Sequence, residues 1–307
     1  MLGVRIAMAV LFSMGMAMLA LAQVPPASHP AACERRNDRP FKVFSLLAYR
    51  EQPDMAAYGM LPAHIIDRDL WAPGVKRSEP PDPAAIRKVL ADLPQNNGPI
   101  ILDIEDFPLD GDPRVSDDSI MRLQRILRAV RKEARGRTIG FYSIVPVRDY
   151  WRRIKGRNSP EFKTWQRDND RTLTIEREVD VIMPSIYTLY EDRAGWQDYA
   201  VDQICEARRL SKKPVYVFMW PEYDNPAYNG REVDADYWRM ELETAYRYAD
   251  GIVLWSGADV TRISGMRPWN PQAPWWLETE RFLRTIANQP RSQQPVVIAR
   301  KARRTRR

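Results

Sequence analysis

The stretch GPIILDIEDFPLDG, residues 98–111, runs from an apolar, β-branched string directly into a series of carboxylates. Such a string is typical of a strand that is covered on both faces, as in a parallel sheet. A strand in that position has no favourable place for a carboxylate, because removing the charge from water costs roughly several kcal/mol unless a partner offsets it. Asp103 and Glu105, at the end of the string, are therefore expected to be functional residues.

The rest of the chain repeats this pattern of apolar strands followed by amphipathic helices. No glycine-rich phosphate loop follows any of the expected strands, which argues against a nucleotide-binding, doubly wound fold. The pattern predicts an α/β fold, a (β/α) barrel of the TIM type that is irregular and has seven or eight strands. The expected strands span residues 43–49, 64–71, 100–105, 138–145, 179–187, 215–220 and 251–255, and the helical stripes lie within 82–93, 120–134, 196–207, 238–245 and 275–286.

The ends of the chain differ in composition from the body between them. The first residues contain Arg5, a long apolar run and the triplet Ala20-Leu21-Ala22, a pattern that predicts a cleavable signal peptide. The protein is therefore expected to be secreted or periplasmic, and retention of the apolar run as a membrane anchor is the alternative. The expected divisions are a signal peptide at 1–22, a linker at 23–37, a barrel domain at 38–287 and a basic disordered tail at 288–307.

The formal charge of +7 comes from this tail. Residues 288–307 hold seven basic and no acidic side chains, so the 47 basic residues of the chain fall to 40 in the remainder, against 40 acidic ones. A neutral body gives no reason to expect specific nucleic-acid binding, and we expect a monomer. The tail is expected either to contact a polyanion or an anionic envelope surface, or to be a solvated segment of no specific role.

Histidine and cysteine are scarce, which excludes several kinds of catalytic and metal site. Cys33 and Cys205 are the two cysteines, and an even number in an exported chain suggests one disulfide, with two unpaired thiols as the alternative. The histidines are His29 and His64, and no cysteine cluster occurs, so a Ser-His-Asp triad, a Cys-His pair and a zinc site all lack a base or a ligand. We expect no metal and no cofactor, so proton transfer would depend on carboxylates and tyrosines.

Side chains at the carboxyl ends of the predicted strands are suited to sugar chemistry. Because side chains alternate along a strand, Asp103 and Glu105 should point into the barrel mouth while Ile104 points toward the helices. Two carboxylates held close in a partly dry pocket cannot both ionise easily, so one should keep its proton near neutral pH and act as a general acid. Rings of Tyr and Trp at neighbouring strand ends would supply flat apolar faces. The combination predicts glycoside hydrolysis.

Four segments lie in order along residues 40–260: the run 101–105 that ends in Asp-Ile-Glu, PSIY at 184–187, PVYV at 214–217 with Tyr223-Asp224 after it, and GIVLW at 251–255. Together they resemble the hyaluronidase family of glycoside hydrolases. The resemblance implies that Glu105 is the proton donor to the glycosidic oxygen. It also implies that Asp103 orients the substrate's N-acetyl group, whose carbonyl oxygen attacks the anomeric carbon, and that Tyr187 helps to hold this group.

The resemblance also indicates a substrate pocket. Tyr223 and Trp255 match family positions that border the cleaved sugar, while Trp220 and Glu222 lie at the end of the same predicted strand as Tyr223. We expect these four residues to bind substrate. The sequence departs from the family at residues 106–108, where Asp-Phe-Pro stands in place of an Arg that helps to accept an acidic polysaccharide. A neutral or differently charged N-acetylhexosamine polymer is therefore expected to fit at least as well as hyaluronan.

The predicted function is a secreted endo-β-N-acetylhexosaminidase that cleaves an N-acetylhexosamine-containing polysaccharide by retaining, substrate-assisted hydrolysis. Two alternatives from other classes stay open. A non-catalytic glycan-binding protein on the same barrel would keep the aromatic rings but would not need the acidic pair. A polyanion-binding protein would work through the basic tail, with the barrel as its scaffold.

Overall fold

The computed structural model describes residues 33–35, 39–71, 75, 77, 80–94, 96–259 and 265–288. The expected signal peptide, most of the expected linker and the tail beyond Asn288 lie outside these residues. In the described part of the chain, no helix combines the length and the apolar composition that a membrane span requires. The domain predicted for residues 38–287 can be compared with the structure over nearly its whole length.

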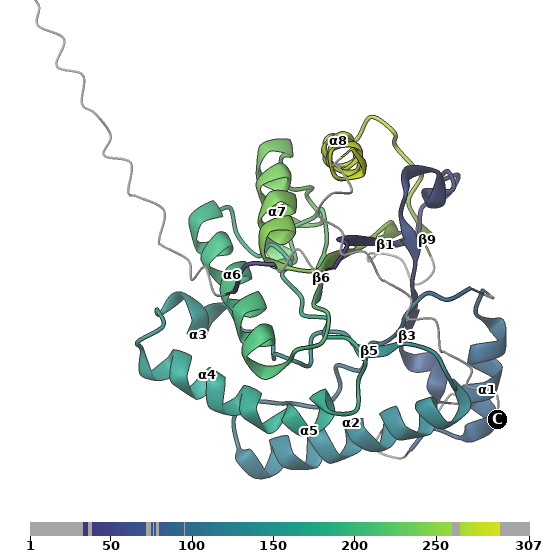
Figure 1. Cartoon of the computed structure of the whole chain (residues 1–307), viewed down its shortest axis with the longest axis vertical. Helices are drawn as coiled ribbons and strands as arrows, with labels where there is room; N and C mark the ends of the chain where they lie inside the picture. Colours follow the sequence, from purple (N-terminus) through teal and green to yellow (C-terminus); the bar gives the residue numbers. More distant parts are fainter. Residues whose placement is uncertain are drawn as a thin grey trace, which may run out of the picture.

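Parallel strands form the centre of the molecule, and helices cover them (Figure 1). One sheet has the strand order β2-β1-β7-β6 and another has the order β3-β4-β5, and every pair in both sheets is parallel. This arrangement confirms the predicted α/β class. The strands are β1 (Lys42–Leu47), β2 (Leu61–Pro62), β3 (His64–Ile66), β4 (Ile100–Leu102), β5 (Ile139–Phe141), β6 (Tyr216–Met219) and β7 (Gly251–Ser256), with β8 (Ala258–Asp259) and β9 (Gly265–Met266) as a small antiparallel pair.

The strand predicted at 179–187 is present only as isolated parallel bridges. Met183 bridges to Tyr142, which follows β5, and Ser185 bridges to Phe218 of β6. Pro184 lies between them and has no N–H to donate, which explains why a continuous ladder does not form. At a second point in the chain, β2 and β3 are separated by one residue and belong to different sheets. The hydrogen-bonded ladders therefore do not run continuously around a ring.

The helices surround the strands, from α1 at the right of Figure 1, through α2 and α4 below, to α6, α7 and α8. The five predicted helical stripes correspond to α1, α2, α6, α7 and α8. Three further helices between residues 150 and 176 were not predicted, because apolar residues are sparse among the charged ones there. The bounds are α1 (Pro83–Asp92), α2 (Pro113–Glu133), α3 (Tyr150–Ile154), α4 (Pro160–Arg171), α5 (Leu173–Glu176), α6 (Arg193–Leu210), α7 (Ala235–Tyr248) and α8 (Pro274–Ala287), with short 3-10 turns η2 (Met55–Tyr58), η3 (Arg68–Leu70) and η4 (Pro226–Tyr228).

Side-chain alternation along the strands divides the buried apolar residues into two cores. The outer core holds Leu102 together with the buried apolar faces of the helices, whereas Ile101 belongs to an inner core to which no helix contributes. Ile104 is fully buried in the outer core. Asp103 and Glu105 therefore continue the inner row that Ile101 begins, as the period of two predicts. The buried residues of the inner core are Phe44, Ala63, Ile101, Tyr142, Val181, Met183, Tyr187, Tyr216, Phe218, Trp220 and Val253.

A disulfide between Cys33 and Cys205 joins the first described residues to α6. Glu34 forms an ion pair with Arg247 of α7, and the backbone N–H of Arg35 donates to the carbonyl of the same arginine at 2.9 Å. The bridge closes a separation of 172 residues, and cross-links over long loops stabilise a fold mainly by restricting the unfolded chain. The even cysteine count thus indicated the correct pairing.

Candidate active site

A cavity of about 540 Å³ opens at the carboxyl ends of the parallel strands. This is the end at which parallel α/β barrels carry their active sites, because several strand ends bring side chains to one place there. The cavity is lined by residues that lie on, or shortly after, β3, β4, β5, β6 and β7. The lining residues are Ile65, Asp103, Glu105, Tyr142, Arg148, Tyr187, Phe218, Trp220, Tyr223, Asp224, Asn225, Pro226, Asn229, Gly230 and Trp255.

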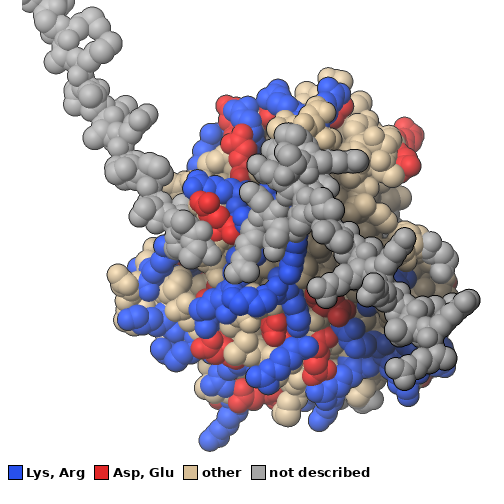
Figure 2. Space-filling model, viewed as in Figure 1, with Lys and Arg blue, Asp and Glu red and all other residues tan. Residues whose placement is uncertain are grey.

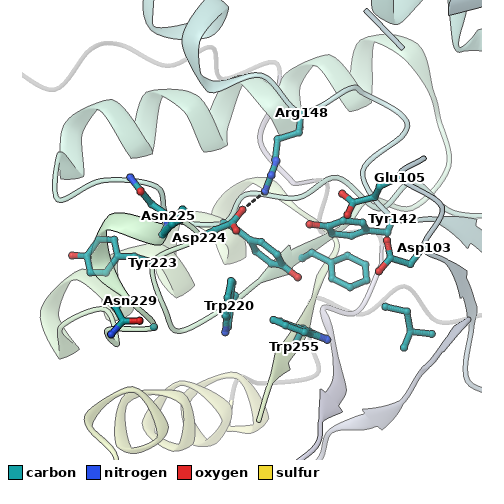
Figure 3. A pocket seen from close by; sticks show the side chains of 15 residues that line it. Asp103, Glu105, Tyr142, Arg148, Trp220, Tyr223, Asp224, Asn225, Asn229 and Trp255 are labelled. Carbon is teal, nitrogen blue, oxygen red and sulfur yellow. Dashed lines mark hydrogen bonds and ion pairs between the residues drawn. The ribbon is translucent and has the colours of Figure 1, made fainter. Parts of the chain in front are cut away.

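Asp103 and Glu105 lie on the same side of this cavity, next to Tyr142 (Figure 3). The last ladder residue of β4 is Leu102, so both acids extend beyond the strand. The backbone N–H of Asp103 donates to the carbonyl of Ile66 at 2.9 Å, which fixes the start of this segment against β3. Asp103 is half-buried and Glu105 is exposed. The structure brings the two predicted carboxylates together at the mouth of the strands.

The surroundings of this acidic pair favour its protonated form. Burial, followed by the negative charges of Glu105 and Asp67, raises the pKa of Asp103 to about 7. Burial also raises the pKa of Glu105, against the opposing positive charge of Arg148. One carboxylate oxygen of Asp103 is buried without a hydrogen-bond partner. Two interacting acids titrate as a unit, so the pair holds a proton near neutral pH, as the spacing predicted.

Aromatic rings form the wall beside the pair. Tyr187, which was predicted as a catalytic residue, lies in the same cavity, and burial raises its pKa well above the ordinary value, so its hydroxyl stays protonated. The ring of Tyr187 stacks with Trp255 at 6.3 Å between centroids and meets Trp220 edge-on at 5.7 Å. Trp220 and Trp255 contact each other at 4.8 Å. Three of the predicted residues thus form one connected aromatic surface.

Tyr223 and Glu222 were also predicted to bind substrate, and the structure separates their roles. Tyr223 lines the cavity, where its ring stacks on Tyr228 at 4.4 Å. Glu222 is not on the cavity wall, and 2% of its surface is exposed. Its carboxylate accepts hydrogen bonds from the indole of Trp220 at 3.1 Å and from the hydroxyl of Ser256 at 3.2 Å, and it forms an ion pair with Arg267. Glu222 is therefore a support behind the aromatic wall, because its charge is already fully engaged.

No role was predicted for Arg148, and Asp224 was interpreted as a turn residue. Both line the cavity and form an ion pair of 2.5 Å across it, drawn as the dashed line in Figure 3. Tyr142 was missed as well, although the alternation that begins at Gly140 places it in the inner row. Arg148 lies in the loop between β5 and α3, beyond the reach of any strand period, so no signal in the sequence could have placed it.

Metal binding has no support in this part of the chain. Within the described ranges, no three or more His, Cys, Asp or Glu side chains are arranged to hold a metal ion. The groups available for chemistry in the cavity are two acids with raised pKa values, tyrosine hydroxyls and one arginine that is paired with an aspartate. Such a set can donate and accept protons and can stabilise a nearby positive charge.

Comparison with known proteins identifies the fold. No known family matches the sequence, and no curated protein matches it. The monoclinic crystal structure of bee venom hyaluronidase aligns over 80% of this chain and 97% of its own, with a TM-score of 0.54 and 14% identity. This chain has a hyaluronidase-like fold. A structure of bee venom hyaluronidase in complex with a hyaluronic acid tetramer aligns over 81% of this chain and 96% of its own, with a TM-score of 0.55 and 14% identity.

The hyaluronidase-like fold confirms the resemblance that the four sequence segments indicated, at the level of the fold. The alignments span nearly the whole length of the hyaluronidase chain, so the similarity is not limited to one βα unit. At 14% identity the similarity concerns the arrangement of the backbone. Activity has to be argued from the side chains in the cavity.

Proposed function

We propose that this protein is a glycoside hydrolase, an exported endo-β-N-acetylhexosaminidase that retains the anomeric configuration of its substrate. The observation that carries the proposal is the placement of Asp103 and Glu105, with raised pKa values, in a cavity walled by aromatic rings. Aromatic faces pack well against sugar rings, and paired carboxylic acids perform most glycoside hydrolysis. The hyaluronidase-like fold supports the proposal.

In the first step, Glu105 donates a proton to the glycosidic oxygen while the bond between that oxygen and the anomeric carbon breaks. The carbonyl oxygen of the neighbouring N-acetyl group attacks the anomeric carbon, and an oxazolinium ion forms. Ionised Asp103 stabilises the positive charge on the acetamido group. Glu105 then takes a proton from water, whose oxygen attacks the anomeric carbon and reopens the ring, and the acid is regenerated.

This cycle requires one proton on the pair. In the free protein, the stronger burial of Asp103 favours that proton on Asp103. A bound sugar would expel water from around Glu105 and raise its pKa further, while the developing oxazolinium charge would favour ionised Asp103. The proton is then available on Glu105, where the leaving oxygen needs it.

The remaining residues of the cavity would hold the sugar. Tyr187 would contact the N-acetyl group from beside Asp103, and Trp255 and Trp220 would present flat faces to the sugar ring. Tyr223 would border the same sugar from the far side of the cavity. The proposal also includes closure of the strands into an irregular TIM-type barrel, export directed by a signal peptide at residues 1–22, and a contact between the basic tail and a polyanion.

Product analysis tests the proposed function. The protein is incubated with soluble N-acetylglucosamine oligomers, poly-N-acetylglucosamine, hyaluronan and cell-wall glycan, and new reducing ends are detected by mass spectrometry and by proton NMR of the anomeric signal. We expect cleavage of at least one N-acetylated polymer, with the β-anomer formed first. Fully de-N-acetylated chains of the same sugar should not be cleaved, because they lack the acetamido oxygen that acts as the nucleophile. Tight binding without any cleavage would instead favour the non-catalytic glycan-binding function.

A further inference from the structure

The charged side chains that line the cavity are mostly acidic. Asp103, Glu105 and Asp224 face one cation, Arg148. Arg148 is held by Asp224 at 2.5 Å, so its charge is already balanced within the cavity. Neither Asp103 nor Glu105 forms an ion pair with any described residue. Apart from the pair of Arg148 with Asp224, the charge that a ligand meets at the cavity wall is the negative charge that Asp103 and Glu105 keep while they hold one proton between them.

A second set of charges outside the wall has the same sign. Asp67 acts on both acids of the pair, and Asp106 acts on Glu105, in each case raising the pKa. Among the residues that the structure describes, Arg77 is a cation beside them, and it forms ion pairs with Asp106 and, at 3.9 Å, with Asp67. This arginine is therefore also balanced by acids before any ligand arrives.

The acidic character belongs to the cavity and not to the molecule as a whole. Lys and Arg side chains are spread over the face shown in Figure 2, with Asp and Glu among them. Ion pairs such as Arg128 of α2 with Glu178, and Arg193 of α6 with Asp234, illustrate this mixture of signs around the helices. A charged polymer would therefore be selected by the cavity itself, where the charges are partly buried and water screens them less.

From this distribution we propose that the cavity accepts an amino-sugar polymer that contains no uronic acid, either neutral or with free amino groups between its N-acetylated units. The inference rests on the proposed function and specifies its substrate class. A uronic acid places one carboxylate in every repeat beside the scissile bond, where it would face the two acids, and the described residues of the cavity wall offer no free cation to meet it. A free amine would instead be attracted to the same acids.

Competition between polymers of equal length tests this inference. Fully N-acetylated glucosamine oligomers, half de-N-acetylated oligomers and hyaluronan oligomers are compared by kcat/KM. We expect at least a tenfold preference for either uronate-free polymer over hyaluronan, and a smaller preference at high salt because salt screens the repulsion. Equal or faster cleavage of hyaluronan would overturn the inference and leave the glycosidase function standing.

Binding gives an answer that does not depend on turnover. The Glu105→Gln variant is run through gels that contain each polymer, and the retardation is compared with that of the wild-type protein. Tighter binding of the uronate-free polymers by both proteins is expected. The wild type could cleave none of these polymers and still bind the uronate-free polymers more tightly than hyaluronan. In that case the proposed function fails and the inference about the polymer class stands. Tighter binding of hyaluronan that an excess of the N-acetylglucosamine oligomer displaces would be binding in the cavity and not on the basic tail, and it would overturn the inference.

An Asp224→Asn variant identifies the source of the preference. The change releases Arg148 from its partner and leaves a free cation in the cavity, so the preference against hyaluronan should shrink by about tenfold. The control is Asp118→Asn, which removes an exposed carboxylate that pairs with Arg122 on α2, and it should leave the preference unchanged. An unchanged preference in Asp224→Asn, together with an unchanged salt dependence, would contradict the electrostatic origin.

Discussion

Two sets of carboxylates stand at the same end of the strands, and their partners differ. Glu222 is almost fully buried and is balanced by Arg267, the indole of Trp220 and the hydroxyl of Ser256. Asp103 and Glu105 form no ion pair with any residue that the structure describes, and Asp103 keeps a buried oxygen without a hydrogen-bond partner. An acid whose charge is engaged supports structure, whereas an acid left beside another acid holds a proton that can be used.

The largest effect expected from this difference is the loss of catalysis when Glu105 is changed to Gln. The amide keeps the shape of the cavity but cannot donate a proton to the leaving oxygen, so cleavage should fall below detection while polymer binding stays within severalfold. Turnover numbers and gel retardation on the same preparation measure both quantities. Turnover near the wild-type rate would remove Glu105 as the acid.

Asp103→Asn is expected to lower kcat by about two to four orders of magnitude, the range typical of a lost acid–base or charge-stabilising group. The loss should appear in kcat more than in KM, because the positive charge that Asp103 stabilises develops after binding. Steady-state kinetics with the best polymer from the product analysis would measure this division. A loss confined to KM would assign Asp103 to ground-state binding.

The same variant should change the pH dependence of stability. The pKa of Asp103 is raised in the folded state from 3.8 to about 7, so its protonated form stabilises the fold at acid pH, and this contribution is lost as pH rises through 7. Asn does not titrate. Between pH 4 and pH 8, wild type should therefore lose up to about 4 kcal/mol of unfolding free energy relative to Asp103→Asn. Urea unfolding at both pH values measures this; equal pH dependence would contradict it.

Glu222→Gln should have the smallest effect on catalysis and a clear effect on stability. Removing the charge leaves Arg267 without its partner but keeps oxygen acceptors for Trp220 and Ser256, so we expect a loss of about 1–3 kcal/mol in unfolding free energy. Activity should stay within tenfold of wild type. A loss of activity as large as that of Asp103→Asn, without a loss of stability, would show that Glu222 acts on the substrate and is not only a support behind the aromatic wall.

The sequence predicted the orientation of Asp103 and Glu105 but did not distinguish them from Glu222. The period of two along β4 predicted that Asp103 and Glu105 point the same way and that Ile104 points to the helices, because strand geometry is local. Glu222 was grouped with them because it also follows a strand. Its partner Arg267 lies 45 residues away, and a contact of that range leaves no mark on local pattern.

The fold was predicted to a similar extent. Apolar strings and helical stripes identified β1, β3, β4, β5, β6 and β7 and five helices. They missed β2, the β8–β9 pair and the charged helices between 150 and 176, and the strand predicted at 179–187 is interrupted at Pro184. The ion pair of Arg148 with Asp224 arises from two loops, whose course is set by tertiary packing. Sequence thus indicated the acidic pair, and the structure added the charges that surround it.

The central claim is that Asp103 and Glu105 share a proton near neutral pH. Carbon-13 NMR of the side-chain carboxyl groups, with the Asp103 signal assigned by its absence in Asp103→Asn, tests this without knowledge of the polymer. We expect Asp103 to titrate with a midpoint of about 7 in the wild type and at a lower pH in Glu105→Gln, where the neighbouring charge is gone. A midpoint within the ordinary range of aspartate in both proteins would contradict the account.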